Sequence, residues 1–326
     1  MGKFFKTFAN GLSIILNSIS IFISLPILIV PLLLTWLIYA PTVIYLKYFY
    51  AWEQYSTPQN LLVLFGFIVL LSVTLCFSCS WLLEMLQDIE ERKSLGLIST
   101  FKRVLFENFV YILPIAIIWA FLWFILTVIS AALSKKDKDD NRELTAQSAA
   151  ETLAGYESFS FSRAFIDALE KGIRMIVFLI MPAIAWENLG SVAAIKKGLS
   201  VFRARLKQFT VGYALTYAAT VLIFLPAGVM IQLGAKGKHG EPPLMHFSDH
   251  AWMGLIVYIG FAWSFSMYLE QMFTASLYMW HLKWEWLCKE AKKIGDPLPE
   301  FNDVRPPLIL KTLPELREFF KPEETK

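Results

Sequence analysis

The stretch Pro182–Phe209, PAIAWENLGSVAAIKKGLSVFRARLKQF, decides the fold. It leaves an apolar segment, passes Glu187 and becomes basic and amphipathic before apolar sequence resumes at Thr210. At about 100° per residue, one side of a helix over this stretch is apolar. Its members are Val192, Ile195, Leu199, Phe202, Leu206 and Phe209. The pattern predicts a helix in the plane of a membrane surface with its cations toward lipid phosphates, rather than a soluble helix packed on a domain core.

Composition excludes an ordinary soluble domain. Of the 326 residues, 56% are hydrophobic and only 17% are charged, whereas soluble domains carry about 25% charged residues. Three cysteines do not make a disulfide framework. The sequence therefore predicts an all-α fold, a polytopic membrane helix bundle with amphipathic interfacial helices on the cytoplasmic side.

Six apolar segments are candidates for transmembrane helices: 21–46, 61–83, 109–133, 159–186, 210–233 and 252–279. The fourth is unusual because its apolar part, Met175–Trp186, is shorter than the roughly 20 residues that cross the hydrocarbon. Either the charged half of this segment enters the membrane with its charges facing protein, or the helix is re-entrant. A full span is the favoured prediction. Pro26 and Pro31 predict a break or kink in the first span.

The rest of the chain divides around these spans. Segments 3–19 and 92–109 are predicted as two further amphipathic interfacial helices, and 134–158 as a polar outer loop. The bundle with its interfacial helices is expected to occupy residues 1–286. Residues 287–326 are expected to form a charged, proline-rich cytoplasmic tail.

Lysine and arginine set the predicted orientation. With the N-terminus inside, the cytoplasmic segments carry 20 of these residues and the outer segments carry 9. The excess predicts a protein that crosses the membrane several times with both termini cytoplasmic. Anionic lipids of the bilayer are the expected partners of the cations beside the spans, and nucleic acid is not. The predicted head-group contacts are Lys102, Arg103, Lys196, Lys197, Arg203, Arg205 and Lys207.

Three glutamates are the candidate functional carboxylates. Glu84, Glu187 and Glu270 each follow an aromatic residue near the end of a helix that is predicted to run inward. Ionisable groups at membrane depth are costly, so each is a functional candidate. Together they could bind a cation, relay protons or anchor the basic interfacial helices. Anchoring is the favoured interpretation.

Other chemical signals are weak. Cys76 and Cys79 have the spacing of a redox or zinc pair, but their place inside an apolar span favours buried thiols. His246 and His250 could hold a metal, although Ser248 nearby is equally well explained as a helix N-cap. We find no signature of a catalytic site or nucleotide loop. No enzyme activity and no cofactor are therefore expected.

A resemblance covers Met181–Gly190, MPAIAWENLG, and the following Ala194–Gly198, AIKKG. These residues resemble a pattern in a broad group of prokaryotic multi-span membrane proteins, mostly of unknown function. The group includes the membrane domain attached to some glycerophosphoryl diester phosphodiesterases. Gly198 stands where those families usually have serine, and the loop 134–158 is not part of their pattern. No phosphodiesterase catalytic domain is present, so that activity does not carry over. The resemblance implies a bacterial inner-membrane protein.

Three hypotheses for function follow. The first is a non-enzymatic scaffold or accessory subunit of a membrane complex, binding a membrane-protein partner or a second copy of the chain. The second is a transporter or channel that uses Glu84, Glu187 and Glu270. The third, an intramembrane enzyme acting on lipid, rests only on the distant family association.

Overall fold

The computed structural model describes residues 2–90, 96–137, 161–234 and 247–306, and every regular element in these ranges is helical. The all-α prediction is confirmed. The chain forms two compact units. Unit 1 contains residues 2–36 and 205–306, and unit 2 contains the described residues between Leu37 and Ala204.

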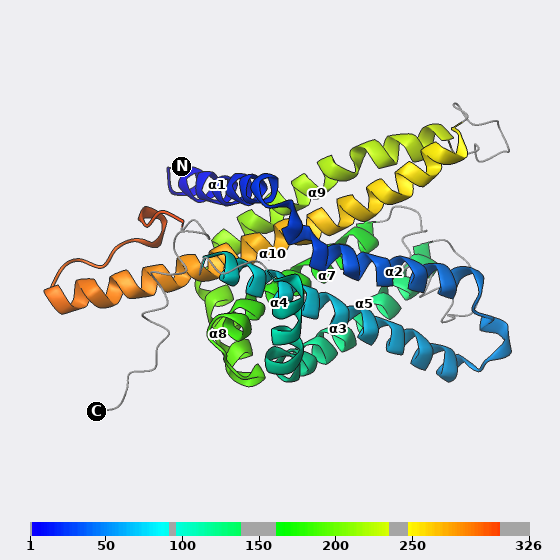
Figure 1. Cartoon of the computed structure of the whole chain (residues 1–326), viewed down its shortest axis with the longest axis horizontal. Helices are drawn as coiled ribbons and strands as arrows, with labels where there is room; N and C mark the ends of the chain where they lie inside the picture. Colours follow the sequence, from blue (N-terminus) through cyan, green and yellow to red (C-terminus); the bar gives the residue numbers. More distant parts are fainter. Residues whose placement is uncertain (1, 91–95, 138–160, 235–246, 307–326) are drawn as a thin grey trace. The chain divides into compact units, whose positions relative to one another are not determined.

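Unit 1 is built on three long helices, α1 (Gly2–Ser24), α9 (Leu206–Gly234) and α10 (Asp249–Ile294). Helices α9 and α10 lie side by side (Figure 1). They are antiparallel, because Gly212 faces Phe273 near one end and Gly234 faces Trp252 at the other. A Cβ at Gly212 would lie 1.9 Å from the Phe273 ring, so only glycine allows this approach.

The N-terminal part of unit 1 runs in one direction along α10. Helix α1 ends before Pro26, and the short η1 (Pro26–Ile29) leads into α2 (Val30–Tyr48), so the break predicted at this proline is confirmed. Tyr268 of α10 donates a hydrogen bond to the Ser18 carbonyl at 3.0 Å, and Ser264 donates to the Leu32 carbonyl at 3.3 Å. Successive contacts thus move steadily along α10, which makes α1 and α2 one broken passage rather than a hairpin.

Unit 2 is centred on α3 (Thr57–Glu90), α5 (Phe109–Asp137) and α7 (Phe161–Ala185), which all pack on one another (Figure 1). The end of α7 lies level with the C-terminal part of α3, because Trp186 donates its indole N–H to the Leu83 carbonyl at 3.3 Å. The 25 residues of α7 rise about 37 Å, enough to run along most of α3.

The sequence PAIAWENLGSVAAIKKGLSVFRARLKQF does not form a single helix. It is divided among the end of α7, a turn, α8 (Ser191–Ala204) and the start of α9. Asn188 occupies the turn with φ 51°, a left-handed conformation that asparagine tolerates better than most residues. The residues that α8 buries are Ala194, Gly198 and Val201. They are smaller than most of the aliphatic and aromatic residues that form the predicted apolar side of this helix. Small residues are needed because α8 lies close to α7: a Cβ on Gly198 would be 2.5 Å from Ile180 Cγ1.

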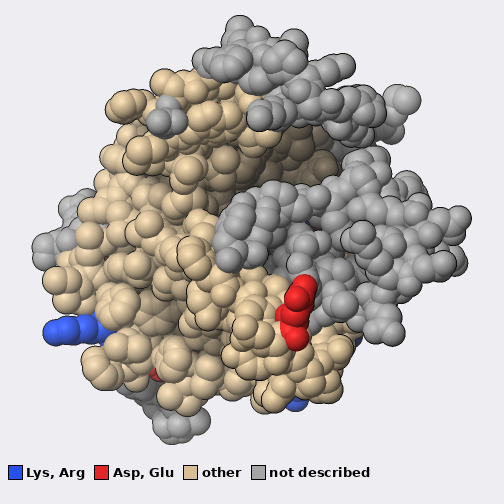
Figure 2. Space-filling model, turned by 90° about the vertical axis from the view of Figure 1, so that its right-hand side faces the viewer, with Lys and Arg blue, Asp and Glu red and all other residues tan. Residues whose placement is uncertain are grey.

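Six helical segments of the described chain are long and apolar enough to cross a membrane. The chain is therefore an integral, multi-pass membrane protein. Five segments cover predicted spans, and the sixth, Phe5–Ser24, covers the predicted interfacial helix 3–19. Helix α7 is not among the six, because any stretch of it long enough to cross a membrane includes the charged residues Glu170, Lys171 and Arg174. On the face in Figure 2, uncharged side chains predominate among the described residues.

The predicted domain boundary at residue 286 falls inside α10, which continues to Ile294. Gly295 ends this helix in the left-handed conformation, with φ 77°. Most of the predicted loop 134–158, His246 and the second half of the predicted tail lie outside the described residues.

Candidate polar site at the inner end of unit 2

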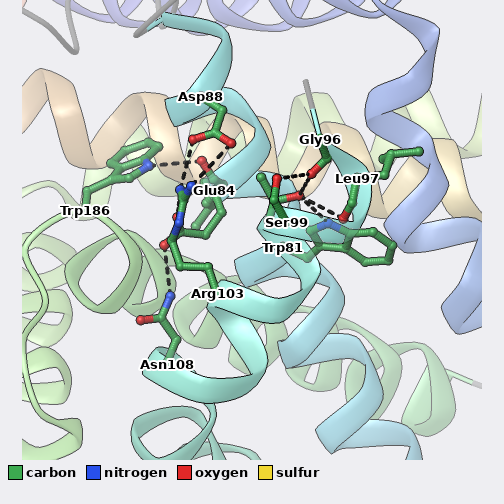
Figure 3. A network of polar contacts seen from close by, with 11 residues as sticks. Trp81, Glu84, Asp88, Gly96, Leu97, Ser99, Arg103, Asn108 and Trp186 are labelled. Atoms are coloured by element: carbon green, nitrogen blue, oxygen red, sulfur yellow. Dashed lines mark hydrogen bonds and ion pairs between the residues drawn. The ribbon is translucent and has the colours of Figure 1, made fainter. Parts of the chain in front are cut away.

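Glu84 sits in a buried polar network near the C-terminal end of α3, which we call the inner end (Figure 3). Arg103 donates from Nη1 to Glu84 Oε2 and to Asp88 Oδ1, both at 2.9 Å. Asn108 donates from Nδ2 to Glu84 Oε1, also at 2.9 Å. Both carboxylic acids are only 2% exposed. We call Glu84, Asp88, Arg103 and Asn108 the inner polar cluster.

Local structure brings these residues together. Glu84 and Asp88 are four residues apart, so they share one face of α3. Arg103 ends the short α4 (Leu97–Arg103), and Asn108 ends the π-helical turn η3 (Val104–Asn108) that leads into α5. π-Helical turns are rare and are often found at functional sites. Here the turn places Asn108 opposite Glu84.

Aromatic contacts fix α4 on α3 beside the cluster. Trp81 donates its indole N–H to Thr100 Oγ1 at 2.9 Å. The Phe101 ring meets Trp81 edge to face, with centroids 5.2 Å apart, and meets Phe77 at 5.0 Å. Helix α4 is therefore held by one polar cluster and one aromatic cluster, both centred on α3.

Charge within the cluster is not balanced. Two carboxylates and one guanidinium leave a net charge of −1 when both acids are ionised. Each Glu84 oxygen has one donor, and Arg103 reaches Asp88 a second time from Nη2 at 3.4 Å. The network satisfies its hydrogen bonds within the protein and can take up one proton to become neutral. Anchoring and proton binding are both compatible with this geometry.

The three predicted glutamates have different surroundings. Glu84 is in the inner polar cluster of unit 2. Glu187 is half-buried in the turn between α7 and α8 of the same unit. Glu270 is 1% exposed within α10 of unit 1. Glu84 and Glu187 lie near helix ends, as predicted. The prediction is wrong for Glu270, which lies in the middle of α10 because that helix continues to Ile294.

The predicted head-group cations divide into two sets. Lys102, Lys196, Arg203 and Lys207 are exposed, and Lys197 is half-buried. Arg103 and Arg205 instead point into the protein: Arg103 binds two carboxylates, and Arg205 is 9% exposed. The amphipathic pattern alone could not separate these two arginines from their neighbours.

Arg205 forms a second polar site, in unit 1. Its guanidinium lies 3.6 Å from the Phe301 ring centroid and 4.0 Å from that of Trp284. Its Nε donates to His281 Nδ1 at 3.1 Å. Burial lowers the pKa of Arg205 to about 10, so the group still carries its charge at neutral pH. The cation is held mainly by ring faces.

Arg205 and α1 hold the chain that returns after α10. Trp280 donates its indole N–H to the Val304 carbonyl at 2.8 Å, and Trp284 donates to the Pro299 carbonyl at 2.9 Å. Lys6 of α1 pairs with Asp303. We call Pro299–Val304 the return segment. The sequence pattern gave no sign that the polar side of α1 would bind it.

Sequence reasoning missed Asp88 and Asn108. Their spacing held a signal for Asp88, which lies one helical turn from Glu84, but none for Asn108, which depends on the π-helical turn. Cys76 and Cys79 are buried cysteines, as predicted. Ser248 is the N-cap of α10, accepting a hydrogen bond from the Ala251 N–H. Among the described residues, no group of three or more His, Cys, Asp or Glu has metal-site geometry.

Comparison with known proteins gives no relative. No family model, curated protein or solved structure matches this chain.

Proposed function

We propose that this integral membrane protein is a scaffold or accessory subunit of a membrane complex. The proposal rests on one observation: charged groups beside the spans hold neighbouring short elements in place. Glu84 and Asp88 hold Arg103 and therefore α4, and Arg205 holds the return segment. These polar interactions fix short elements to the long helices, which suits a rigid structural role. The long helices expose broad apolar faces that fit lipid or another membrane helix.

The membrane setting is part of the proposal. The exposed cations of α4 and α8, Lys102, Lys196 and Arg203, would contact anionic lipid head groups of the inner leaflet. The excess of lysine and arginine supports cytoplasmic N- and C-termini, and the bacterial inner membrane rests on the sequence resemblance alone. A six-crossing path fits if α1 stays on the cytoplasmic side, as its amphipathic pattern predicts, and if α7 crosses despite its charges.

The likeness to the membrane domain of certain phosphodiesterases remains a proposal. Its motif, Met181–Gly190 with Ala194–Gly198, covers the α7–α8 turn and the contact of Gly198 with α7. A family that shares this motif is expected to share that turn.

Affinity purification from native membranes in a mild detergent tests the scaffold role. We expect a membrane protein to co-purify at fixed stoichiometry and to be lost in an Arg103→Met variant that still inserts. Lys102→Ala, an exposed neighbour, is the matched control and should retain the partner. A wild-type protein that purifies alone, after crosslinking in intact membranes as well, would contradict the scaffold role.

A second candidate function is transport. The observation that favours it is a set of buried polar atoms in unit 2 without hydrogen-bond partners in the described chain, which begins at Gln87 beside the inner polar cluster and extends away from it. Such atoms are costly in a dry helix bundle.

A further inference from the structure

Buried polar atoms without a hydrogen-bond partner concentrate in two neighbouring helices of unit 2. On α3 they are Ser72 Oγ, Ser80 Oγ and Gln87 Oε1. On α5 they are Trp119 Nε1, Trp123 Nε1 and Ser130 Oγ. Within the described residues only Arg205 and Gln271 of unit 1 have other such atoms, and Gln271 also makes other contacts. Because α3 and α5 pack directly on each other, this concentration calls for one explanation.

The six side chains fall on one narrow arc of each helix. At about 100° per residue, Ser72, Ser80 and Gln87 fall within an arc of about 80° on α3. Trp119, Trp123 and Ser130 fall within about 40° on α5. Continued to Asn108, this face of α5 holds the amide that contacts Glu84 of α3. The Glu84–Asn108 bond joins this face of α5 to α3 at a residue that falls about 40° beyond Ser80 on the α3 wheel.

These residues are spread along the length of the helices. Counting from the Glu84–Asn108 contact, Trp119 is level with Ser72 and Ser130 lies about 16 Å farther out. Gln87 lies beyond Glu84 at the inner end. The row therefore extends from the inner polar cluster past the middle of α3.

The two tryptophans make the strongest case for a polar ligand. A serine hydroxyl can rotate toward a helix carbonyl, but an indole N–H has a fixed direction and only donates. Trp119 is 2% exposed and Trp123 is 8% exposed. Their rings stack with centroids 5.6 Å apart and planes 10° apart. Leaving a buried donor unpaired costs about 1–3 kcal/mol, and internal water commonly supplies the missing acceptor.

We propose that the α3–α5 interface holds a file of water molecules that carries protons between the inner polar cluster and the outer half of unit 2. Indole N–H groups would orient the water oxygens, and the serine hydroxyls would both accept and donate. This inference deepens the second candidate function, because it names the proton as the transported species. It does not depend on the scaffold role.

The inner polar cluster suits the inner end of such a path. With both acids ionised the cluster has a net charge of −1, so a proton from cytoplasmic water can bind Glu84 and neutralise the cluster. The proton then passes to the file as one O–H bond forms and another breaks at each water. One proton leaves at the far end and the carboxylate regains its charge. The net result is one proton moved, with no oxidant or co-reactant.

The first experiment tests hydration. The protein is placed in nanodiscs of deuterated lipid, and the indole N–H signals are assigned by single Trp→Phe substitutions. We expect magnetisation transfer from water to Trp119 and Trp123. Trp280, which is 1% exposed and bonds to the Val304 carbonyl, is the control and should show none. Absence of transfer at both Trp119 and Trp123 overturns the proposal.

The second experiment measures proton flux in liposomes that contain a pH-sensitive dye, driven by a potassium diffusion potential. Wild-type protein should acidify or alkalise the lumen according to the sign of the potential. We expect at least a tenfold loss in Glu84→Gln and in the double variant Trp119→Phe/Trp123→Phe. Trp284→Phe, in unit 1, should retain the wild-type rate.

The outcomes of the two experiments separate the claims. Wild-type flux no higher than that of protein-free liposomes, with water present at Trp119, overturns proton transfer. Equal flux in all variants overturns the assigned path. Circular dichroism and gel filtration identify any variant that fails to fold. For such a variant Trp123→Phe alone takes its place, and unchanged flux in that folded variant also counts against the path. Whether a partner co-purifies does not bear on either experiment, so the scaffold role and the proton path can fail separately.

Discussion

At the scale of single residues, the charged groups beside the spans differ more than their sequence spacing indicates. Arg103 and Lys102 are adjacent, yet one is enclosed by two carboxylates and the other is exposed. Truncating one member of a buried ion pair leaves an uncompensated charge, which typically costs about 3–5 kcal/mol. Truncating an exposed cation costs little. Neighbouring cations of the same helix therefore make very different contributions to stability.

Arg103→Met should lower the free energy of unfolding by about 3 kcal/mol, because Glu84 and Asp88 stay buried without their cation. Unfolding in mixed micelles with increasing sodium dodecyl sulfate measures the change. Lys102→Met, the neighbouring exposed position, should change it by less than about 0.5 kcal/mol. Equal effects at the two positions would show that the cluster does not fasten α4.

Gly198→Ala should destabilise the protein by about 1–3 kcal/mol, because its Cβ would lie 2.5 Å from Ile180 Cγ1 and 3.1 Å from Ile180 Cα. Gly172→Ala in α7, where a Cβ meets nothing within 4 Å, is the matched control. That change should be neutral or stabilising, since alanine favours helix. The same unfolding titration measures both, and a neutral Gly198→Ala would mean that α8 does not pack closely on α7.

At the scale of elements, long helices were predictable from the sequence and short fastened elements were not. Apolar runs of sufficient length locate α3, α5, α9 and α10, because each must satisfy its backbone within the membrane. The division of the stretch from Pro182 into α7, a turn and α8 depends on Asn188 adopting a left-handed conformation. Helical periodicity contains no information about such a turn. Glu84 was predictable as a buried acid, whereas its partner Asn108 required the π-helical turn.

The return segment should depend on Arg205 for its attachment to α10. Arg205→Ala removes the cation between Trp284 and Phe301 and should free Pro299–Val304 from α10. Limited chymotrypsin digestion should then cut after Phe301, which is 7% exposed in the native protein, at least several-fold faster. Arg203→Ala, an exposed arginine two residues away, should leave the cleavage rate unchanged. Equal rates in wild type and Arg205→Ala would exclude a fastening role for Arg205.

At the scale of the whole molecule, composition and hydropathy predicted an all-α multi-pass membrane protein, and six apolar helical segments confirm it. They could not predict which segments pair. Phe5–Ser24 and Pro26–Leu46 both meet the length and composition of a span, yet contacts along α10 show them end to end. Helix α7 fails the composition criterion but packs along α3 and α5. Hydropathy measures each segment alone, whereas topology depends on their contacts.

The proposed orientation puts the basic helices α4 and α8 on the cytoplasmic side of the membrane and the α2–α3 connection on the other side. Single cysteines at Lys102, Lys196 and Tyr55, in a background with Cys76, Cys79 and Cys288 replaced, test this orientation. A membrane-impermeant maleimide applied to intact spheroplasts should label Tyr55→Cys. It should label Lys102→Cys and Lys196→Cys only after the membrane is opened. Labelling of either lysine position in intact spheroplasts, with Tyr55→Cys protected, would contradict the account.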